Sequence, residues 1–385
     1  MSPLFDAGRH HQLDAESWTT SAARRAIDDF IRDAERDFRG PALWPIHPID
    51  RSPERATTLK TLYYGAAGMI WSLSELGAEP TGAADILALA RSEARREASR
   101  LNPDGLSSFL MAEAGFALLQ AKLGAGSVDL YSTLEAALEA HPTGIVWGRA
   151  GALLAARFAR ALGDHASLED LIARGASTLR DARDANGLWT TELNGHRDQM
   201  LSALHGYCAN MGTLLRVAPD PSLIDSARTV LSAHAVRGAE GVNWPLTAGP
   251  STRAPDLPLL LQFCNGAPGV IVMLGGLLGD DFDNEFLLAA GELIWRAGPP
   301  TKLPSLCHGA PGSGYAFLRL FETTGDALWL ERARAFAMHA VRANGRCIRE
   351  HGQRKYSLWT GDAGLALYLR ACLDAAPAFP TLDRL

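Results

Sequence analysis

A short glycine-containing motif followed by an apolar run recurs along the chain. The runs after the motif are apolar on nearly all sides, which is typical of helices buried among other helices. A single match would be weak, but repetition at intervals long enough for two helices predicts a repeat architecture. The instances read YYGAAGMIWSL (63–73), LMAEAGFALL (110–119), VWGRAGALLAARFA (146–159), LHGYCANMGTLL (204–215), FCNGAPGVIVML (263–274), LCHGAPGSGYAFLRL (306–320) and WTGDAGLALYL (359–369).

The segments between these motifs are amphipathic. Trp329, Phe336 and Ala340, for example, fall on one stripe of a helix. Strand-like alternation is scarce. Each repeat is therefore predicted to pair an outer amphipathic helix with an inner buried helix. Similar amphipathic patterns occupy 84–101, 165–185 and 284–297.

Seven such helix pairs close most economically into a ring. The predicted fold is therefore all-α, a seven-fold double-layered α/α barrel or toroid. We expect residues 1–385 to form one domain, with the repeats starting near residue 60 and 1–59 forming an N-terminal helical extension that packs on the barrel. Because every glycine turn precedes an inner helix, the turns should gather at one end, where helix N-termini favour anionic ligands.

The composition is that of a globular protein with a sizeable core, since 47% of the residues are apolar and 21% are charged. The formal net charge is −6 and no basic stripe stands out, which argues against nucleic acid as a partner. The longest apolar stretches, such as 270–278, are too short for a membrane span. The first residues lack the pattern of a secretory signal, and five cysteines, an odd number, are typical of reduced thiols. We therefore expect a cytoplasmic protein.

Two of the glycine turns carry a cysteine, and these two suggest a metal site. Cys264 and Cys307 each stand two residues before a motif glycine in consecutive repeats, and His308 follows Cys307. Two thiolates and an imidazole are sound zinc ligands, and three protein ligands leave a fourth position open for a substrate. The sequence therefore predicts a Zn²⁺ site on these residues. The remaining cysteines, at 208, 347 and 372, are interpreted as small buried hydrophobic residues.

The CNGAPG and CHGAPG motifs, together with the seven glycine turns, resemble the lanthionine synthetase C-like family from about residue 60 to the end. The resemblance implies a seven-fold α/α barrel with a single zinc held by Cys264, Cys307 and His308. It also implies a Michael-type addition, in which a zinc-bound thiolate attacks a dehydroalanine or dehydrobutyrine residue of a peptide or protein and forms a thioether. The donor is a cysteine of the same peptide in bacterial cyclases and glutathione in eukaryotic relatives.

Two further positions carry the proton chemistry that the resemblance implies. His205 matches a family histidine at the mouth of the active site and is the candidate acid or base. Asn265 replaces the Tyr or His that usually follows the first zinc cysteine, and its amide can hydrogen-bond an enolate. Gly144 stands where peptide cyclases often carry an acidic residue, which weakens the assignment as a cyclase, and Ala209 takes a usual glycine position.

Candidate substrate-binding residues are basic. Lys302 matches a basic residue that the glutathione-using branch is thought to use on the thiol substrate. The sequences around both cysteine motifs also resemble that branch more closely than the cyclases. Arg149, Arg349 and Arg354 are weaker candidates for the same role.

Two alternatives to an enzyme of this family stay open. The first is a non-catalytic zinc-binding adaptor or maturation partner with the same fold, motivated by Asn265 and Gly144. The second is a carbohydrate-active enzyme on an α/α barrel, which needs a pair of carboxylates at the rim. Glu113 and Asp362 lie inside turns, but they do not form a convincing pair.

Overall fold

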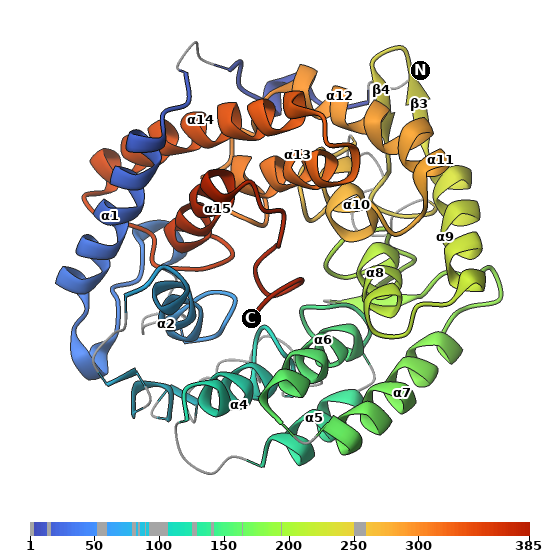
Figure 1. Ribbon diagram of the computed structural model, residues 1–385, viewed down its shortest axis with the longest axis horizontal. Helices are drawn as coiled ribbons and strands as arrows, with labels where there is room; N and C mark the ends of the chain where they lie inside the picture. The colour runs from blue at the N-terminus through green and yellow to red at the C-terminus, as the bar shows by residue number, and fades with distance from the viewer. Residues whose placement is uncertain are drawn as a thin grey trace.

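The computed structural model describes residues 4–13, 17–51, 60–78, 82–83, 85–88, 90–91, 107–124, 129–139, 142–163, 165–193, 195–249 and 259–385. This part of the chain is mostly helical, and its helices lie in two concentric layers (Figure 1). The predicted amphipathic segment 84–101 lies largely outside the described residues. The longer helices are α1 (Thr20–Asp37), α2 (Ala66–Glu75), α4 (Glu113–Lys122), α5 (Leu130–Glu139), α6 (Arg149–Ala159), α7 (His165–Asp181), α8 (Tyr207–Val217), α9 (Pro221–His234), α10 (Ala267–Leu274), α12 (Leu288–Ala297), α13 (Ala310–Thr324), α14 (Ala327–His351) and α15 (Asp362–Asp374).

The inner layer consists of the helices that the glycine motifs predicted. Each of the inner helices begins directly after the first glycine of its motif, a place that Ala112 takes before α4. These helices are α2, α4, α6, α8, α10, α13 and α15. Consecutive inner helices contact one another, and α15 contacts α2. Their side chains supply much of the buried core, as expected for helices that are apolar on nearly all sides. The periodic sequence pattern therefore located these helices correctly.

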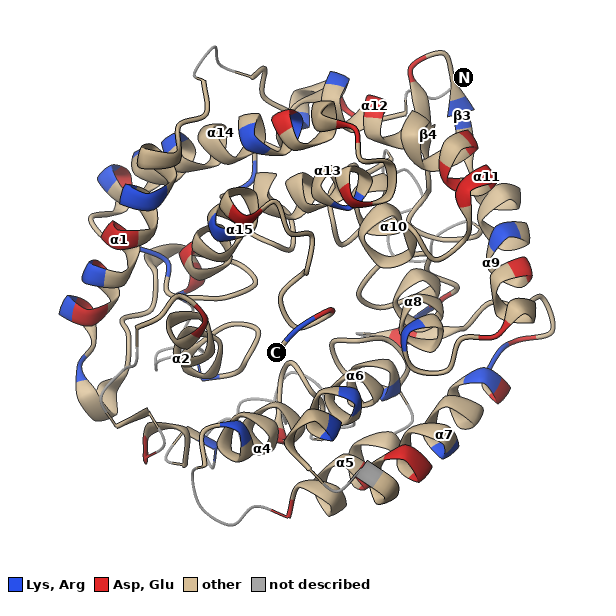
Figure 2. Cartoon of the chain, in the orientation of Figure 1, with Lys and Arg blue, Asp and Glu red and all other residues tan. Residues whose placement is uncertain are grey.

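The outer helices are amphipathic, and three of them begin with side-chain caps. Thr19, Asp220 and Asp326 accept hydrogen bonds from backbone N–H groups in the first turns of α1, α9 and α14. Charged side chains gather on the outer helices, while the inner ones carry few (Figure 2). Helix α1 lies in the outer layer, where it contacts α14 and α15.

Strand structure among the described residues is limited to two short antiparallel hairpins. The first joins β1 (Thr191–Leu193) to β2 (His196–Asp198), and the second joins β3 (Val236–Gly238) to β4 (Gly241–Asn243). Both precede a motif turn: β1 and β2 lead toward α8, and β3 and β4 lead toward α10. Short elements at the outer edge are η3 (Pro48–Asp50), α11 (Asp280–Phe282) and the π-helical turn η7 (Asp283–Leu287).

Backbone hydrogen bonds join the motif turns to one another. The residue two places before the first motif glycine makes most of these bonds. Cys264 N donates to Cys307 O (3.1 Å), Cys307 N to Trp359 O (3.0 Å), Trp359 N to Tyr63 O (3.1 Å) and Tyr63 N to Leu110 O (2.9 Å). Ala203 N donates likewise to Cys264 O (3.3 Å). The turns therefore lie side by side at one end of the molecule, and the last repeat meets the first.

Several N–H groups at the start of the inner helices donate to the chain's own carbonyls. Arg149 N donates to Pro142 O (3.0 Å), Tyr207 N to Met200 O (2.8 Å) and Asp362 N to Lys355 O (2.9 Å). In these three turns the first N–H group of the helix is already bonded to a carbonyl of the preceding segment. These N–H groups are therefore not open to anionic ligands, contrary to the expectation from the sequence.

The C-terminal segment after α15 lies at the centre of the ring (Figure 1). Phe379 within it is fully buried. Its ion pairs join three inner helices: Asp383 with Arg216 of α8 (3.0 Å) and Arg319 of α13 (2.7 Å), and Arg384 with Glu75 of α2 (3.0 Å). The chain's own end thus fills part of the space between the inner helices.

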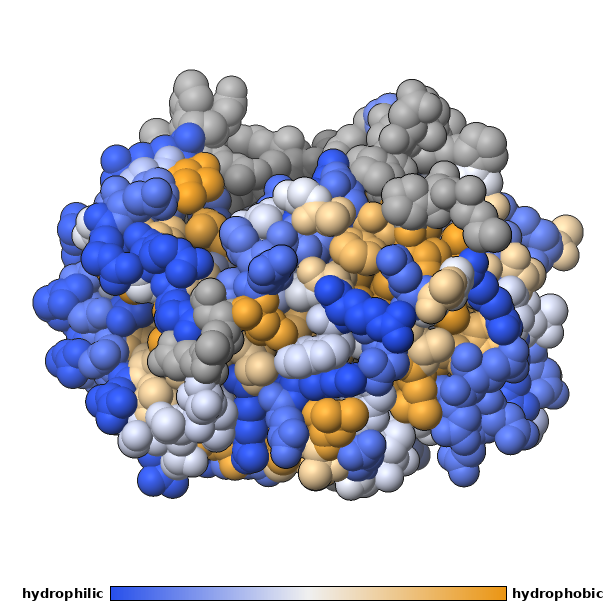
Figure 3. Space-filling model, turned by 90° about the horizontal axis from the view of Figure 1, so that it is seen from above, coloured by the Kyte–Doolittle hydropathy of each residue, from blue (hydrophilic) through white to orange (hydrophobic). Residues whose placement is uncertain are grey.

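Within the described chain, none of the helices is both long and apolar enough to cross a membrane. On the face drawn in Figure 3, hydrophilic residues dominate and the apolar ones form small interrupted patches. The exposed large hydrophobic side chains belong to separate elements. Single exposed apolar residues of this kind are ordinary in a folded protein.

Candidate metal centre

Cys264, Cys307 and His308 form a compact cluster at the rim where the turns meet. One ligating atom from each lies within 4.8 Å of the other two. Cys264 Sγ is 3.7 Å from His308 Nδ1, and Cys307 Sγ is 3.9 Å from His308 Nε2. Both cysteines are buried and the histidine is half-buried. The residues that the sequence proposed as a ligand set are therefore brought together.

The local fold of the two turns sets the positions of the thiols. Gly269 and Gly312, in the first turns of α10 and α13, pack directly on the carbonyl oxygens of Phe263 and Leu306, and a Cβ at either position would overlap them. Gly266 adopts a φ of +103°, a conformation that residues with a side chain rarely reach. Glycine at these positions therefore holds each cysteine tightly against the start of its inner helix.

Two amide side chains donate hydrogen bonds to the Cys264 sulfur. Gln262 Nε2 lies 3.0 Å and Asn265 Nδ2 lies 3.3 Å from Cys264 Sγ. Gln262 and Asn265 face each other through a pair of backbone hydrogen bonds of 3.1 Å each, which turns both side chains toward the thiol. These donors favour the thiolate form of Cys264.

The pKa values of the two cysteines are shifted in opposite directions. The Cys307 thiol donates to Cys264 and lowers the pKa of Cys264 well below its usual range, in opposition to burial and together with His308. Burial and the nearby Cys264 thiolate raise the pKa of Cys307. Burial opposes protonation of His308, but its hydrogen bond to Cys264, the charge of Cys264 and a backbone hydrogen bond at Cys307 together raise the pKa of His308. Without metal, these shifts favour a thiolate on Cys264 beside a thiol on Cys307.

The donor set and spacing fit zinc. Ligands of a tetrahedral zinc, at about 2.3 Å for sulfur and about 2.0–2.1 Å for nitrogen, lie roughly 3.5 Å from one another. The observed sulfur–nitrogen separation of 3.7 Å is close to this value. Zinc binding would release the protons of Cys307 and His308, since both must ligate in the deprotonated form.

Tyr63 contacts the cluster from the first repeat. Its hydroxyl hydrogen-bonds to Cys307, and burial above all raises its pKa. The Tyr63 ring stacks on Trp359, with centroids 5.3 Å apart and planes 7° from parallel. Residues from both ends of the chain therefore support the thiol of Cys307.

A cavity of about 260 Å³ lies next to this cluster. Gln262, whose amide contacts Cys264, forms part of its wall, and Lys302 and Arg9 lie along it. Lys302 is exposed, and its charge lowers the pKa of His308 slightly. Arg9 is paired with Asp6, which also lines the cavity, whereas Lys302 is placed where a substrate carboxylate could reach it. The cavity is separated from the candidate ligands by Gln262.

His205 occupies the turn next to that of Cys264. Ser202 Oγ in this turn donates to Cys264 O at 2.8 Å and accepts from His205 N at 3.2 Å. The His205 side chain is half-buried, like His308 and Asn265 at the equivalent positions of their turns. Gly144 packs on the backbone of His205, has a φ of +91°, and would bring a Cβ against it. The glycine at 144 thus lets two turns approach each other closely.

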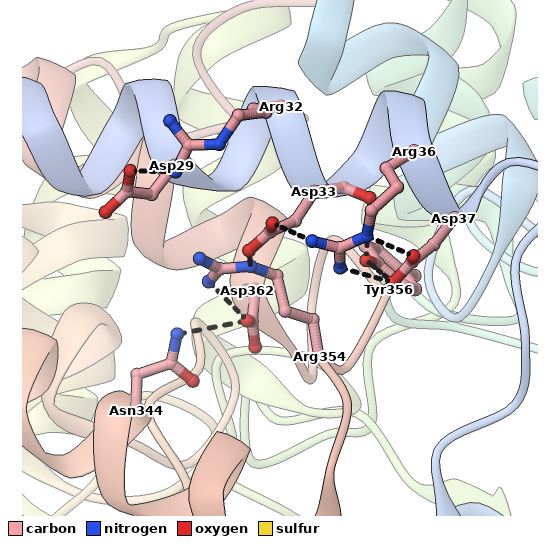
Figure 4. A network of polar contacts seen from close by, with 9 residues as sticks. All are labelled: Asp29, Arg32, Asp33, Arg36, Asp37, Asn344, Arg354, Tyr356 and Asp362. Carbon is pink, nitrogen blue, oxygen red and sulfur yellow. Dashed lines mark hydrogen bonds and ion pairs between the residues drawn. The ribbon is translucent and has the colours of Figure 1, made fainter.

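Two of the proposed substrate-binding arginines have their guanidinium groups engaged within the protein. Arg149 is buried, and its Nε donates to Leu138 O at 2.7 Å. Arg354 pairs with Asp33 of α1 (2.6 Å) and with Asp362 of α15 (3.2 Å), inside a network that ties the outer helix α1 to the inner layer (Figure 4). Arg349, in the last turn of α14, is exposed. The contacts of Arg354 fit a structural anchor.

Gln262 and Tyr63 are site residues that the sequence reasoning missed. Tyr63 shares the position of Cys264 and Cys307, two residues before the first motif glycine, so aligning the seven repeats on that glycine would have found it. Gln262 stands four residues before Gly266, a place where most of the other turns carry a serine or threonine that hydrogen-bonds within its turn, so its departure from that pattern could have found it.

The chain was compared with known proteins. A sequence profile of the family described as lanthionine synthetase C-like protein matches residues 44–383. Glutathione S-transferase LANCL1 of Danio rerio is 39% identical over 133 residues, which are 32% of this chain and 32% of that protein. LanC-like protein GCL1 of Arabidopsis thaliana is 34% identical over 113 residues, 27% of this chain and 26% of that protein. Each match thus spans a third or less of the relative's length.

A solved structure named nisin cyclase resembles the fold. The superposition has a TM-score of 0.55 at 14% sequence identity and covers 91% of this chain and 93% of the other. At this identity the likeness concerns the fold alone. It extends over nearly the whole helical arrangement described above.

Proposed function

The chain belongs to the lanthionine synthetase C-like family, and on that premise we propose that it is a zinc-dependent enzyme that adds a thiol to a dehydroamino acid. The acceptor is a dehydroalanine or dehydrobutyrine residue of a peptide or protein. The thiol donor is glutathione or a peptide cysteine, and the product is a thioether. In this proposal the two helical layers are the closed seven-fold α/α barrel that carries the site.

The observation that carries the proposal is the Cys264–Cys307–His308 cluster, whose neighbour Gln262 lines a cavity that also holds Lys302. Three ligands at the spacing of a tetrahedral site leave a fourth position for an incoming thiol. When bound there, zinc lowers the pKa of the thiol and keeps it as a nucleophilic thiolate near neutral pH. We propose that such a thiol enters from the side of Gln262, where the cavity lies.

The reaction is balanced without any redox partner. The thiol loses its proton, its sulfur forms a bond to the β-carbon of the acceptor, and the carbon–carbon double bond becomes an enolate. A proton then returns to the α-carbon. His205 is proposed to hold and deliver this proton, since it is half-buried in the turn bonded to that of Cys264.

Asn265 and Lys302 have positioning roles in this scheme. One N–H of the Asn265 amide contacts Cys264, and the second can point to the enolate oxygen. Lys302 is proposed to bind a carboxylate of the donor, because it lines the cavity that ends at Gln262. We place the reaction in the cytoplasm, where thiols such as the five free cysteines of this chain stay reduced.

A direct assay tests the proposal. The zinc-loaded protein is incubated with a dehydroalanine peptide and glutathione, and in parallel with a peptide that carries both a dehydroalanine and a cysteine. Mass spectrometry then detects the intermolecular or the cyclic thioether. We expect acceleration over free zinc with one donor, and the preferred donor identifies the branch. His205→Ala should slow the reaction while zinc content stays unchanged.

The matched control for metal binding compares two buried cysteines. Cys307→Ala should lose zinc and activity, whereas Cys208→Ala, in the neighbouring inner helix α8, should keep both. No acceleration with either donor, despite full zinc occupancy, would reject the enzyme in favour of a non-catalytic zinc-binding adaptor with this fold.

A further inference from the structure

A second cluster of ligating side chains lies between the N-terminal segment and the end of α14. His47, Cys347 and His351 each offer one ligand atom within 4.8 Å of the other two. None of them belongs to the centre formed by Cys264, Cys307 and His308. We propose that these three residues form a second metal site, which binds Zn²⁺ or a similar divalent transition metal and fixes the N-terminal segment to the outer layer.

The spacing within α14 suits a shared metal. Cys347 and His351 are four residues apart in one helix, so both side chains project from the same face. His47 comes from the segment that leads into η3, and its Nε2 lies 3.9 Å from Cys347 Sγ. The rings of His47 and His351 meet edge to face, with centroids 4.8 Å apart. Three convergent soft or borderline donors are the ligand type of zinc.

The surroundings leave these donors available. His47 is 2% and Cys347 is 7% exposed. The ammonium of Lys355 is paired with Asp50 at 2.8 Å, which directs this cation to a carboxylate. The remaining charged groups that act on Cys347 include Asp362 and Glu350, and both are negative.

Metal binding requires one change of hydrogen bonding. His47 Nδ1 accepts a hydrogen bond from Ile49 N, at a long distance of 3.3 Å. A neutral imidazole that ligates through Nε2 carries its proton on Nδ1 and cannot accept there. Loading the site therefore gives up this weak contact at the start of η3, a change that reports on occupancy.

A void beside His47 can complete the coordination. It has a volume of about 10 Å³ and is lined by Tyr64 and Lys355 among others, which is room for roughly one water molecule. Three protein ligands and a water are a known zinc arrangement. Tyr64 adjoins Tyr63, whose hydroxyl contacts Cys307, so the second site lies just behind the first-repeat turn of the candidate active centre.

The site would strengthen an attachment that already exists. Trp44 Nε1 donates to Ala34 O of α1 at 2.8 Å, and Gln353 Nε2 donates to Ile46 O at 2.9 Å. The segment from Trp44 to His47 is thus held between α1 and the end of α14. A metal that binds only the folded arrangement stabilises it further, in proportion to the logarithm of the metal concentration.

Zinc stoichiometry of the full-length protein tests the proposal. After equilibrium dialysis against Zn²⁺, the wild type should hold two equivalents, and a Cys264→Ala/Cys307→Ala variant should retain one. Adding Cys347→Ala to that variant should remove the remaining equivalent. Cys372→Ala, a buried cysteine outside both clusters, is the matched control and should change nothing.

Two further measurements keep the result decisive. If Cys347→Ala perturbs folding, His351→Gln in the Cys264→Ala/Cys307→Ala background removes a half-buried ligand instead, and the thermal unfolding of that triple variant should no longer respond to Zn²⁺. Cobalt bound to the Cys264→Ala/Cys307→Ala variant should show a single-thiolate charge-transfer band that Cys347→Ala abolishes. A wild type with one equivalent that survives Cys347→Ala and His351→Gln overturns the second site.

Discussion

Phe379, close to the C-terminus, stacks on Phe263, the residue directly before Cys264, with ring centroids 4.6 Å apart and planes 19° from parallel. The Phe379 ring also lies 5.5 Å from Trp359, which neighbours Cys307 through a backbone hydrogen bond. The C-terminal segment therefore supports the two turns of the candidate metal centre from inside the ring.

This contact predicts the effect of removing the ring. Phe379→Ala should lower the free energy of unfolding by about 3–5 kcal/mol, the usual cost of emptying a buried aromatic site. Zinc affinity should fall as well, because the turn of Cys264 loses its support. Denaturant titration and a competitive zinc chelator measure the two effects. Phe286→Ala, a buried phenylalanine of η7 that stacks on Phe282, should reduce stability by a similar amount and leave zinc affinity unchanged.

The ion pairs of the C-terminal segment predict a pH dependence of stability. Burial raises the pKa of Asp383, but Arg216 and Arg319 outweigh it, so the folded-state pKa lies below the unfolded value of about 3.9. The contribution of Asp383 is therefore complete above about pH 4 and is lost as the pH falls through its folded pKa. Asp383→Asn should cost about 3–5 kcal/mol at neutral pH, since it leaves two buried arginines without a carboxylate.

Urea titrations of the wild type and Asp383→Asn at pH 7 and near pH 3 check this prediction. The difference in unfolding free energy between the two proteins should shrink at the lower pH. A difference that stays constant would mean that the carboxylate charge contributes nothing to stability.

Alanine substitutions at two glycines, one in an inner turn and one in an outer helix, should change stability in opposite directions. Gly312→Ala should destabilise the protein by about 1–3 kcal/mol and weaken zinc binding, because the new Cβ overlaps Leu306 O and forces the turn of Cys307 to move. Gly345→Ala, within α14, meets its nearest atom, of Arg349, at 3.5 Å and should stabilise by about 0.5–1 kcal/mol. Thermal unfolding and zinc content of both variants measure the contrast, and equal effects would contradict it.

Substitutions of Lys302 and Arg354 should affect different properties, substrate binding for Lys302 and stability for Arg354. Lys302→Gln is expected to raise the KM for glutathione about tenfold at unchanged stability, since a hydrogen bond to a charged group contributes about 1.5–3 kcal/mol. Arg354→Gln should instead destabilise the fold by about 3–5 kcal/mol, because Asp33 and Asp362 lose their common partner. Steady-state kinetics and denaturation of both variants separate the roles. A raised KM for Arg354→Gln at unchanged stability would assign it to the substrate.

Some features of this protein were predictable from local sequence alone. The glycine motifs located the starts of the inner helices, because glycine is needed where a helix start packs on a carbonyl oxygen of its own turn. The positions of Cys264, Cys307 and His308 in equivalent turns of consecutive repeats predicted that they meet. Both inferences use only short-range periodicity and the assumption that repeats stack side by side.

Other features were decided only by tertiary structure. Tyr63 reaches Cys307 because the last repeat meets the first, Phe379 reaches Phe263 because the chain end turns into the ring, and Arg354 is held by Asp33 because α1 lies over α15. His47 meets Cys347 and His351 for the same reason. These partners come from distant parts of the sequence, and only Tyr63 is marked by a local pattern, its place two residues before a motif glycine. The sequence by itself determined the repeats and the ligand types, whereas the packing of the two layers chose which side chains surround them, since burial and charge pairing depend on neighbours that only the folded chain supplies.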